Sequence, residues 1–199
     1  MRIGIFGGTF DPPHIGHQIL AAEALVELKL DRVLWMLTPD PPHKKFLKIT
    51  PVEHRIRMVE LAIDGNPSFA ISTIDIDRDP PHYAVDTMSI LKGQASNIKY
   101  FYLMGLDSLN DLPTWHKPAE FIKLCHKIVV MMRQEGVYNP SSVEAGIPGL
   151  IKKVYFLKTP IIEISGTDIR TRIKKGNQYR YFVPEKVYRY IQKNQLYQD

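Results

Sequence analysis

Apolar runs rich in Val, Ile and Leu alternate along the chain with segments whose apolar residues recur at helical spacing. The runs predict buried strands, and the periodic segments predict helices. We expect strands over Arg2–Phe6, Val33–Leu37, Phe69–Ile74, Lys99–Met104, Lys127–Met132 and Val154–Leu157. We expect helices over Gly16–Lys29, Thr50–Asp64, Ala84–Lys92, Gly166–Lys175 and Pro184–Lys193.

This alternation favours an α/β fold, in which a Rossmann-like, doubly wound parallel sheet carries helices on both faces. No repeat, low-complexity tract or Ser/Gly linker interrupts the chain. We therefore predict a single domain over residues 1–199, with a C-terminal helical segment, about residues 164–199, packed on it. Ligands in such folds bind beyond the carboxyl ends of the strands, so the residues after each strand are the candidates for chemistry.

Composition narrows the class of protein. The 199 residues include one cysteine, which excludes an internal disulfide framework and a multi-cysteine metal site. No apolar run approaches the ~20 residues that cross a bilayer, and the first strand follows Met1 without a signal-peptide pattern. We expect a cytoplasmic protein with no membrane contact.

The net charge of +5 is unevenly distributed. Residues 1–150 carry 15 basic and 17 acidic side chains, whereas residues 151–199 carry 11 basic and 4 acidic ones. A basic C-terminal quarter suits a polyanionic partner, either nucleic acid or the phosphates of a small ligand, although a merely solvated basic surface is the simpler interpretation.

The first candidate motif follows the first strand and runs from Gly7 to His17. Gly7 and Gly8 allow a sharp turn and a close approach of backbone N–H groups to a ligand. His14 and His17 are three residues apart and share a face at a helix N-terminus, a position that favours anions. Thr9 adds a hydroxyl, and Gly16 lets a bulky anion approach the helix. The spacing is neither the dinucleotide fingerprint nor a Walker loop.

A second candidate motif opens the helix at Gly166. Ser165 and Asp168 have capping-box spacing and predict a helix start. Gly166, Thr167 and Arg170 add an exposed backbone, a hydroxyl and a forked cation suited to phosphate oxygens. Two such anion sites could together hold a triphosphate.

Other strand ends carry weaker signals. Lys44 could reach a phosphate or be solvated, and Arg55 could lie beside an anion site or at the surface. Asp107, after Gly105, suits a ribose diol, and Trp115 offers a flat face for a heterocycle or belongs to the core. Because no nucleophile with an activating base is evident, the pattern favours phosphoryl or nucleotidyl transfer by positioning and charge stabilisation.

The stretch Gly7-Gly8-Thr9-Phe10-Asp11-Pro12-Pro13-His14-Ile15-Gly16-His17 resembles the signature of the bacterial nicotinate-nucleotide adenylyltransferases, within the His-x-Gly-His nucleotidyltransferases. The resemblance runs nearly end to end. Its further parts are Pro41-Pro42-His43-Lys44, His54-Arg55, Arg78 with Tyr83, Asp86 and Thr87, Gly105 with Asp107 and Trp115, Arg133, Ile164 to Arg170, Val183-Pro184 and Leu196-Tyr197.

The resemblance implies transfer of AMP from ATP to nicotinate mononucleotide, giving deamido-NAD and pyrophosphate by direct in-line attack, with Mg²⁺ carried on ATP and no metal held by the protein. The implied partners are these small molecules and not nucleic acid, and a homo-oligomer is possible. The implied catalytic residues are His14, His17 and Thr9. ATP would be bound by Gly7, Gly8, Phe10, Gly16, Gly105, Asp107, Ser165, Gly166, Thr167 and Arg170, and the nicotinate nucleotide by Lys44, Tyr83, Ala84, Trp115 and His116.

Two residues depart from the family pattern, and one of them, Ala84, bears on specificity. Ala84 and Gly166 stand where the family usually has Thr and Ser. If backbone N–H groups bind the nicotinate carboxylate, Ala84 has no effect; if a hydroxyl helps, discrimination against nicotinamide weakens. Two other functions stay open, a phosphopantetheine adenylyltransferase and a nucleic-acid-binding module that uses the basic C-terminal segment.

Overall fold

The computed structural model describes residues 1–40, 49–132, 140–160 and 162–198. Its centre is a six-stranded sheet in the order β3-β2-β1-β4-β5-β6, and every pair of neighbouring strands is parallel. The strands are β1 (Arg2–Gly8), β2 (Arg32–Leu37), β3 (Phe69–Ser72), β4 (Lys99–Gly105), β5 (Lys127–Met131) and β6 (Val154–Leu157). The predicted doubly wound parallel sheet is confirmed.

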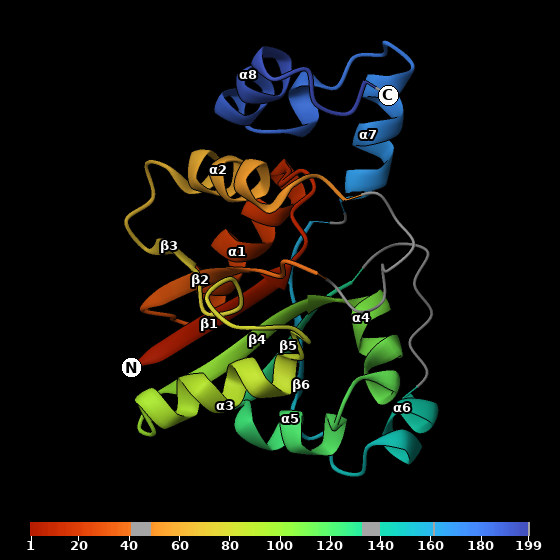
Figure 1. Cartoon of the computed structure of the whole chain (residues 1–199). Coiled ribbons are helices and arrows are strands. Elements are labelled where there is room, and N and C mark those ends of the chain that lie inside the picture. The colour runs from red at the N-terminus through yellow and green to blue at the C-terminus, as the bar shows by residue number, and fades with distance from the viewer. Residues whose placement is uncertain (41–48, 133–139, 161, 199) are drawn as a thin grey trace.

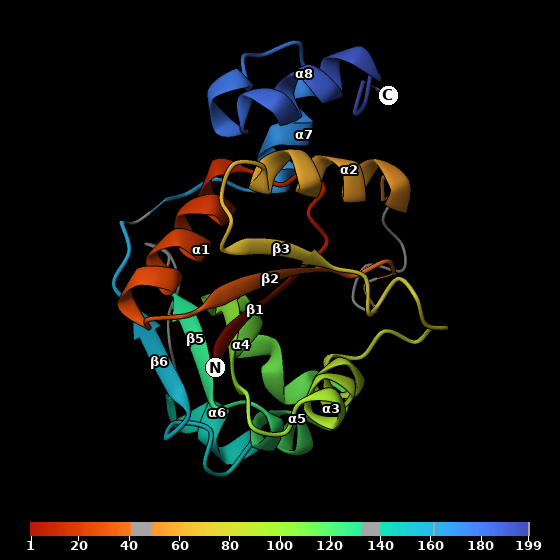
Figure 2. The ribbon, with the colours of Figure 1, turned by 90° about the vertical axis from the view of Figure 1, so that its left-hand side faces the viewer.

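Helices cover both faces of this sheet (Figures 1 and 2). On one face lie α1 (Ile15–Glu27) and α2 (Val52–Ile63). On the other lie α3 (Ala84–Gln94), α4 (Leu106–Asp111), α5 (Pro118–Leu124) and α6 (Pro140–Gly146). Because side chains alternate across a strand, Ile5 of β1 joins the core on the second face and Phe6 joins the core on the first.

The C-terminal segment forms α7 (Gly166–Lys174), a short 3₁₀ turn (Arg180–Phe182) and α8 (Glu185–Lys193). It lies above α2 in Figure 1 and shares a small core with it. Met58 and Ala62 of α2 pack there with Ile169, Val187 and Ile191. This contact places the start of α7 beside the loop that leaves β1.

The order of the strands decides where a ligand can bind. From β1 the chain builds the sheet outward through β2 to β3, and it then returns to place β4 on the other side of β1. The connections after β1 and β4 therefore run to opposite faces and leave a crevice at the carboxyl ends of these two strands. Both candidate glycine segments, Gly7-Gly8 and Gly105, lie at this point.

Candidate active site

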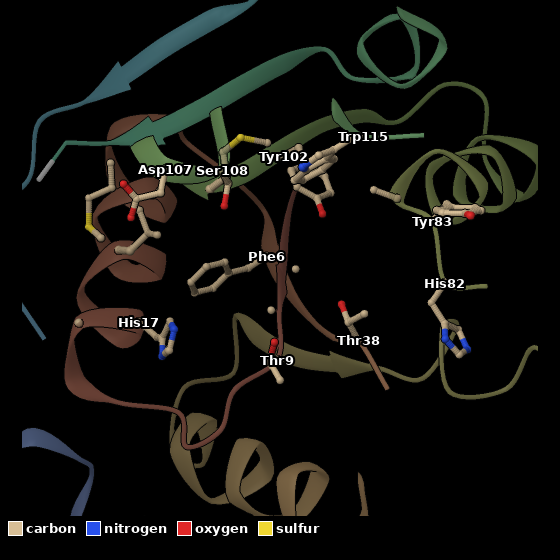
Figure 3. A pocket seen from close by; sticks show the side chains of 18 of the residues that line it. Phe6, Thr9, His17, Thr38, His82, Tyr83, Tyr102, Asp107, Ser108 and Trp115 are labelled. Carbon is tan, nitrogen blue, oxygen red and sulfur yellow. The ribbon is translucent and has the colours of Figure 1, made fainter. Parts of the chain in front are cut away.

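A cavity of about 780 Å³ opens at the carboxyl ends of β1 and β4. Figure 3 shows His17 and Asp107 towards one end, and Tyr83 and His82 towards the other. The cavity is lined by Phe6, Gly7, Gly8, Thr9, His14, Gly16, His17, Leu20, Thr38, His82, Tyr83, Ala84, Tyr102, Met104, Gly105, Asp107, Ser108, Thr114, Trp115, His116, Lys117, Met131, Ile162 and Ile164.

The two histidines of the first motif meet at the start of α1. His14 is the N-cap residue and His17 lies in the first turn, and their rings stack with centroids 3.5 Å apart. The backbone N–H of His14 donates to Nδ1 of His17 at 3.1 Å. Since Nδ1 accepts this bond, a neutral His17 carries its proton on Nε2. The ring can therefore present an N–H donor to a ligand.

Close packing explains two glycines of this motif, which the sequence did not reveal. A Cβ on Gly16 would lie 3.1 Å from Nδ1 of His14, and one on Gly8 would lie 2.9 Å from the ring of Phe10. Phe10 itself is buried against Phe6, His17 and Trp35 and does not line the cavity. Its side chain holds the His17 ring from behind rather than facing the space that the prediction assigned to ATP.

The second motif lies next to the first. Nη1 of Arg170 donates to the backbone oxygen of Asp11 at 2.7 Å, and a Cβ on Gly166 would come within 3.0 Å of the same oxygen. Ser165 caps α7, since its hydroxyl accepts from the N–H of Asp168 at 3.1 Å. Ser165 to Arg170 do not line the cavity themselves, but the preceding Ile162 and Ile164 do. The fold thus brings the two predicted anion sites together.

Asp11 joins several segments behind the histidines. Its carboxylate accepts a hydrogen bond from the hydroxyl of Tyr197 at 2.7 Å, and the N–H of Thr50 lies 3.4 Å from its other oxygen. With the Arg170 bond, this residue ties the β1–α1 loop to α7, to the C-terminal tail and to the entrance of α2. The sequence showed Asp11 only as part of a motif, because these partners are distant along the chain.

The side chain of Arg55 holds the same loop through hydrogen bonds to backbone oxygens. Arg55 is 2% exposed, and its guanidinium donates to the carbonyl oxygens of Thr9, Thr38, Pro39 and Thr50 at 2.7–3.1 Å. Burial lowers the pKa of Arg55, and the nearby carboxylates of Asp11 and Asp40 act against that shift. Because protein carbonyls occupy the guanidinium, Arg55 is a structural clamp. It lies beside the predicted anion site of the β1–α1 loop, and the alternative that it is a surface residue is wrong.

The far end of the cavity is aromatic. The rings of Tyr83 and His116 stack with centroids 4.2 Å apart, and Trp115 packs against Tyr102 and Phe121. Ala84 is the first residue of α3, so its N–H is among those that have no partner inside the helix. A planar ring and a carboxylate could both be accommodated here.

A polar cluster behind this end sets the position of Tyr83. Arg78 donates to the backbone oxygens of Pro81 and Tyr83 at 2.8 and 3.3 Å, and it pairs with the buried carboxylate of Asp75 at 3.0 Å. The hydroxyl of Thr87 donates to the same carboxylate at 2.6 Å. Asp75 was not predicted, because nothing in its sequence neighbourhood announces a buried acid.

The remaining predicted residues fall into two groups. Gly105 and Asp107 line the cavity where β4 passes into α4, and no described atom lies within 4 Å of a Cβ built on Gly105. Lys44 and Arg133 lie outside the described residues. Sequence reasoning missed five polar cavity residues among those described, which are Thr38, Tyr102, Ser108, Thr114 and Lys117.

The basic C-terminal segment is partly neutralised at the surface. Arg180 and Arg189 both pair with Glu185, and Lys186 pairs with Asp64. Arg170 instead reaches the loop beside the cavity. Among the helices that the structure describes, none is long and apolar enough to span a bilayer.

Comparison with known proteins agrees with this geometry. The cytidylyltransferase-like family matches residues 5–172. The nicotinate-nucleotide adenylyltransferase of Bacillus subtilis is 39% identical over 198 residues, which cover 99% of this chain and 98% of that protein. A protein of Thermomicrobium roseum, named a probable nicotinate-nucleotide adenylyltransferase, is 43% identical over 98% of this chain and 91% of its own length.

A solved structure shares the fold. The nicotinic acid mononucleotide adenylyltransferase of Plasmodium falciparum, complexed with NaAD, superposes with a TM-score of 0.80 at 18% sequence identity. The match covers 98% of this chain and 97% of that one. The full-length sequence similarity, together with the matching fold, shows that the chain belongs to the nicotinate-nucleotide adenylyltransferases and is a nucleotidyltransferase.

Proposed function

We propose that this enzyme transfers AMP from ATP to nicotinate mononucleotide in NAD synthesis. An oxygen of the mononucleotide's 5′-phosphate attacks the α-phosphorus of ATP in line and forms the new P–O bond. The bond from the α-phosphorus to the bridging oxygen breaks, and pyrophosphate leaves with its electron pair. The product is deamido-NAD, and no bond to the protein forms.

One observation carries this proposal: a single cavity joins the paired histidines of α1 to the aromatic end at Trp115. A phosphate chain suits the first end, because a helix N-terminus and the Nε2–H of His17 both favour negative charge. A pyridine ring with a carboxylate suits the second end. The aromatic side chains there could stack on the ring, and N–H groups at the start of α3, which have no partner inside the helix, could bind the carboxylate.

The other predicted residues receive roles from their positions. Asp107 and Gly105, at the end of β4, would meet the ribose of ATP. The start of α7, with Thr167 and Arg170, would bind the β- and γ-phosphates, since it lies against Asp11 in the histidine loop. The backbone around Ala84 and His116 would receive the nicotinate carboxylate, which makes a hydroxyl at position 84 unnecessary.

Mg²⁺ would enter on the triphosphate. Among the described residues, no group of three or more His, Cys, Asp or Glu side chains is placed to hold a metal. Mg²⁺ is commonly held by substrate phosphates and water rather than by a protein cage, so this donor set fits a nucleotide-borne ion. The ion would offset the negative charge that collects on the leaving pyrophosphate.

The proposal is tested by measuring pyrophosphate release and deamido-NAD formation while ATP, Mg²⁺ and nicotinate mononucleotide are omitted one at a time. We expect product only when all three are present. Turnover with 4′-phosphopantetheine but with no pyridine nucleotide would reassign the substrate. Tight, salt-sensitive binding of nucleic acid without catalysis would support the nucleic-acid-binding module instead.

The in-line step has its own test. ATP labelled in the α-phosphate, incubated with the enzyme without the acceptor, should leave no label on the protein. An ATP analogue chiral at the α-phosphorus should give an inverted product. A trapped adenylyl-protein or retention of configuration would show two displacements and contradict the direct attack.

A further inference from the structure

The side chain of Tyr102 lines the cavity, and its hydroxyl faces the open space. Tyr102 lies in β4 and is 8% exposed, and its ring packs edge to face against Trp115 and Phe121. In Figure 3 the ring lies beneath Trp115 and its oxygen points into the open space. Among the described residues, none makes a hydrogen bond to this oxygen.

The neighbouring tyrosine of the same strand behaves differently. Tyr100 lies two residues earlier, joins the same core as Tyr102, and donates its hydroxyl to the backbone oxygen of Leu91 at 3.0 Å. Buried phenols usually have such a partner, because an unsatisfied polar atom lowers stability. A phenylalanine at position 102 would pack in the same way against Trp115 and Phe121, so packing does not explain the hydroxyl, and its place at the cavity points to a ligand.

The position of this oxygen limits which part of a ligand it can reach. A Cβ built on Gly7 would lie 2.6 Å from it, so the hydroxyl lies over the end of β1, where the predicted phosphate loop begins. The ring that carries it contacts Trp115, the predicted platform for the pyridine. In a mononucleotide that spans these two points, the ribose lies between them.

We propose that Tyr102 is a substrate-binding residue whose hydroxyl donates a hydrogen bond to a ribose oxygen of the pyridine nucleotide. This inference rests on the proposed function. It adds a residue that the resemblance does not mark, and it assigns that residue to the acceptor nucleotide rather than to ATP.

The chemistry of the group suits a donor. Burial raises the pKa of the Tyr102 phenol, and the nearby Cys125 and Asp75 raise it further. The phenol therefore stays protonated in neutral solution. Ribose oxygens can accept its hydrogen bond.

Two matched variants separate this role from a structural one. Tyr102→Phe removes only the oxygen that faces the cavity, and Tyr100→Phe removes only the oxygen bonded to Leu91. Each variant is compared with the wild type by KM for nicotinate mononucleotide, KM for ATP, the calorimetric Kd of nicotinate mononucleotide, and Tm.

We expect Tyr102→Phe to raise both the KM and the Kd for nicotinate mononucleotide about 3- to 10-fold, the loss of one neutral hydrogen bond. Its KM for ATP should stay within about twofold of the wild type and its Tm should not fall. Tyr100→Phe should show the reverse pattern, with a lower Tm and unchanged constants for both substrates.

The inference is overturned if the Tyr102→Phe constants for nicotinate mononucleotide stay within about twofold of the wild type. It is also overturned if KM for ATP rises equally, or if Tm falls as in Tyr100→Phe. Free nicotinate, which has no ribose, should bind both proteins alike, and weaker binding to Tyr102→Phe would place the contact on the ring. If wild-type protein makes no product from any pyridine nucleotide, the proposed function itself fails.

Discussion

Replacing Arg55 by methionine tests whether the loop around the cavity depends on a buried clamp. Methionine has a similar length, but it removes the guanidinium that donates to four backbone oxygens. Those oxygens belong to the loop after β1, the segment after β2 and the entrance of α2. The change leaves them without a charged donor in a region that is closed to water at Arg55.

The loss of folding stability expected for Arg55→Met follows from two opposing effects. A hydrogen bond to a charged group contributes about 1.5–3 kcal/mol, whereas keeping a guanidinium out of water costs several kcal/mol. Removing one member of such a buried arrangement typically costs about 3–5 kcal/mol. For a chain of this length, that loss corresponds to a fall in Tm of roughly 10 °C.

The assay is urea denaturation, followed by circular dichroism and extrapolated linearly to water. Arg57→Met is the matched control, because Arg57 is on the same helix but is exposed and pairs with Glu60 at 2.8 Å. An exposed pair of this kind contributes at most about 1 kcal/mol. ATP binding is measured on both variants under conditions in which they are folded.

The structural role of Arg55 would be refuted if Arg55→Met lowered the free energy of unfolding by less than about 1 kcal/mol, which is no more than an exposed ion pair contributes. Unchanged stability with greatly weakened ATP binding would show that the guanidinium binds phosphate. Weaker stability with near-normal ATP affinity of the folded fraction supports the structural role.

Three further predictions concern single residues. His17→Ala should lower kcat by about 10²-fold in the pyrophosphate assay, since it removes charge stabilisation in the transition state, and a near-wild-type rate would contradict that role. Gly105→Ala should raise KM for ATP by about tenfold, or about 1.4 kcal/mol, without lowering Tm, because a Cβ there would meet only the open cavity. Gly93→Ala is the control and should leave KM for ATP unchanged. Equal KM values for the two variants would show that Gly105 is not part of the ATP site. Burial raises the pKa of Cys125 to about 12, so the thiol should react with a disulfide reagent at pH 8 only after denaturation, and rapid labelling of the folded protein would disprove this.

The strands and the long helices could be predicted because their patterns are local. Six apolar runs became the six strands, and β6 begins and ends at the predicted residues, Val154 and Leu157. The helices α4, α5 and α6 were missed, since each has only 6 or 7 residues. Such lengths span about two turns, too few for a periodic pattern to emerge.

The motifs indicated where to look for the site, but not which atoms face the ligand. Gly8 was interpreted as part of a sharp turn and Gly16 as room for an anion, and the structure adds that a Cβ on either would press against the ring of Phe10 or His14. Tyr102 was hidden within an apolar strand that reads as core. Contacts of this kind depend on residues far apart in the chain.

The sequence by itself determined the α/β class, the parallel sheet and the location of the two candidate anion-binding motifs, because hydrophobic periodicity and helix-start chemistry are encoded within a few neighbouring residues. Only the tertiary structure decided that Arg170 meets Asp11 across 159 positions, that Arg55 is a clamp, and that the hydroxyl of Tyr102 faces the cavity. The physical reason is that burial and hydrogen-bond partners are set by how the helices pack on the sheet.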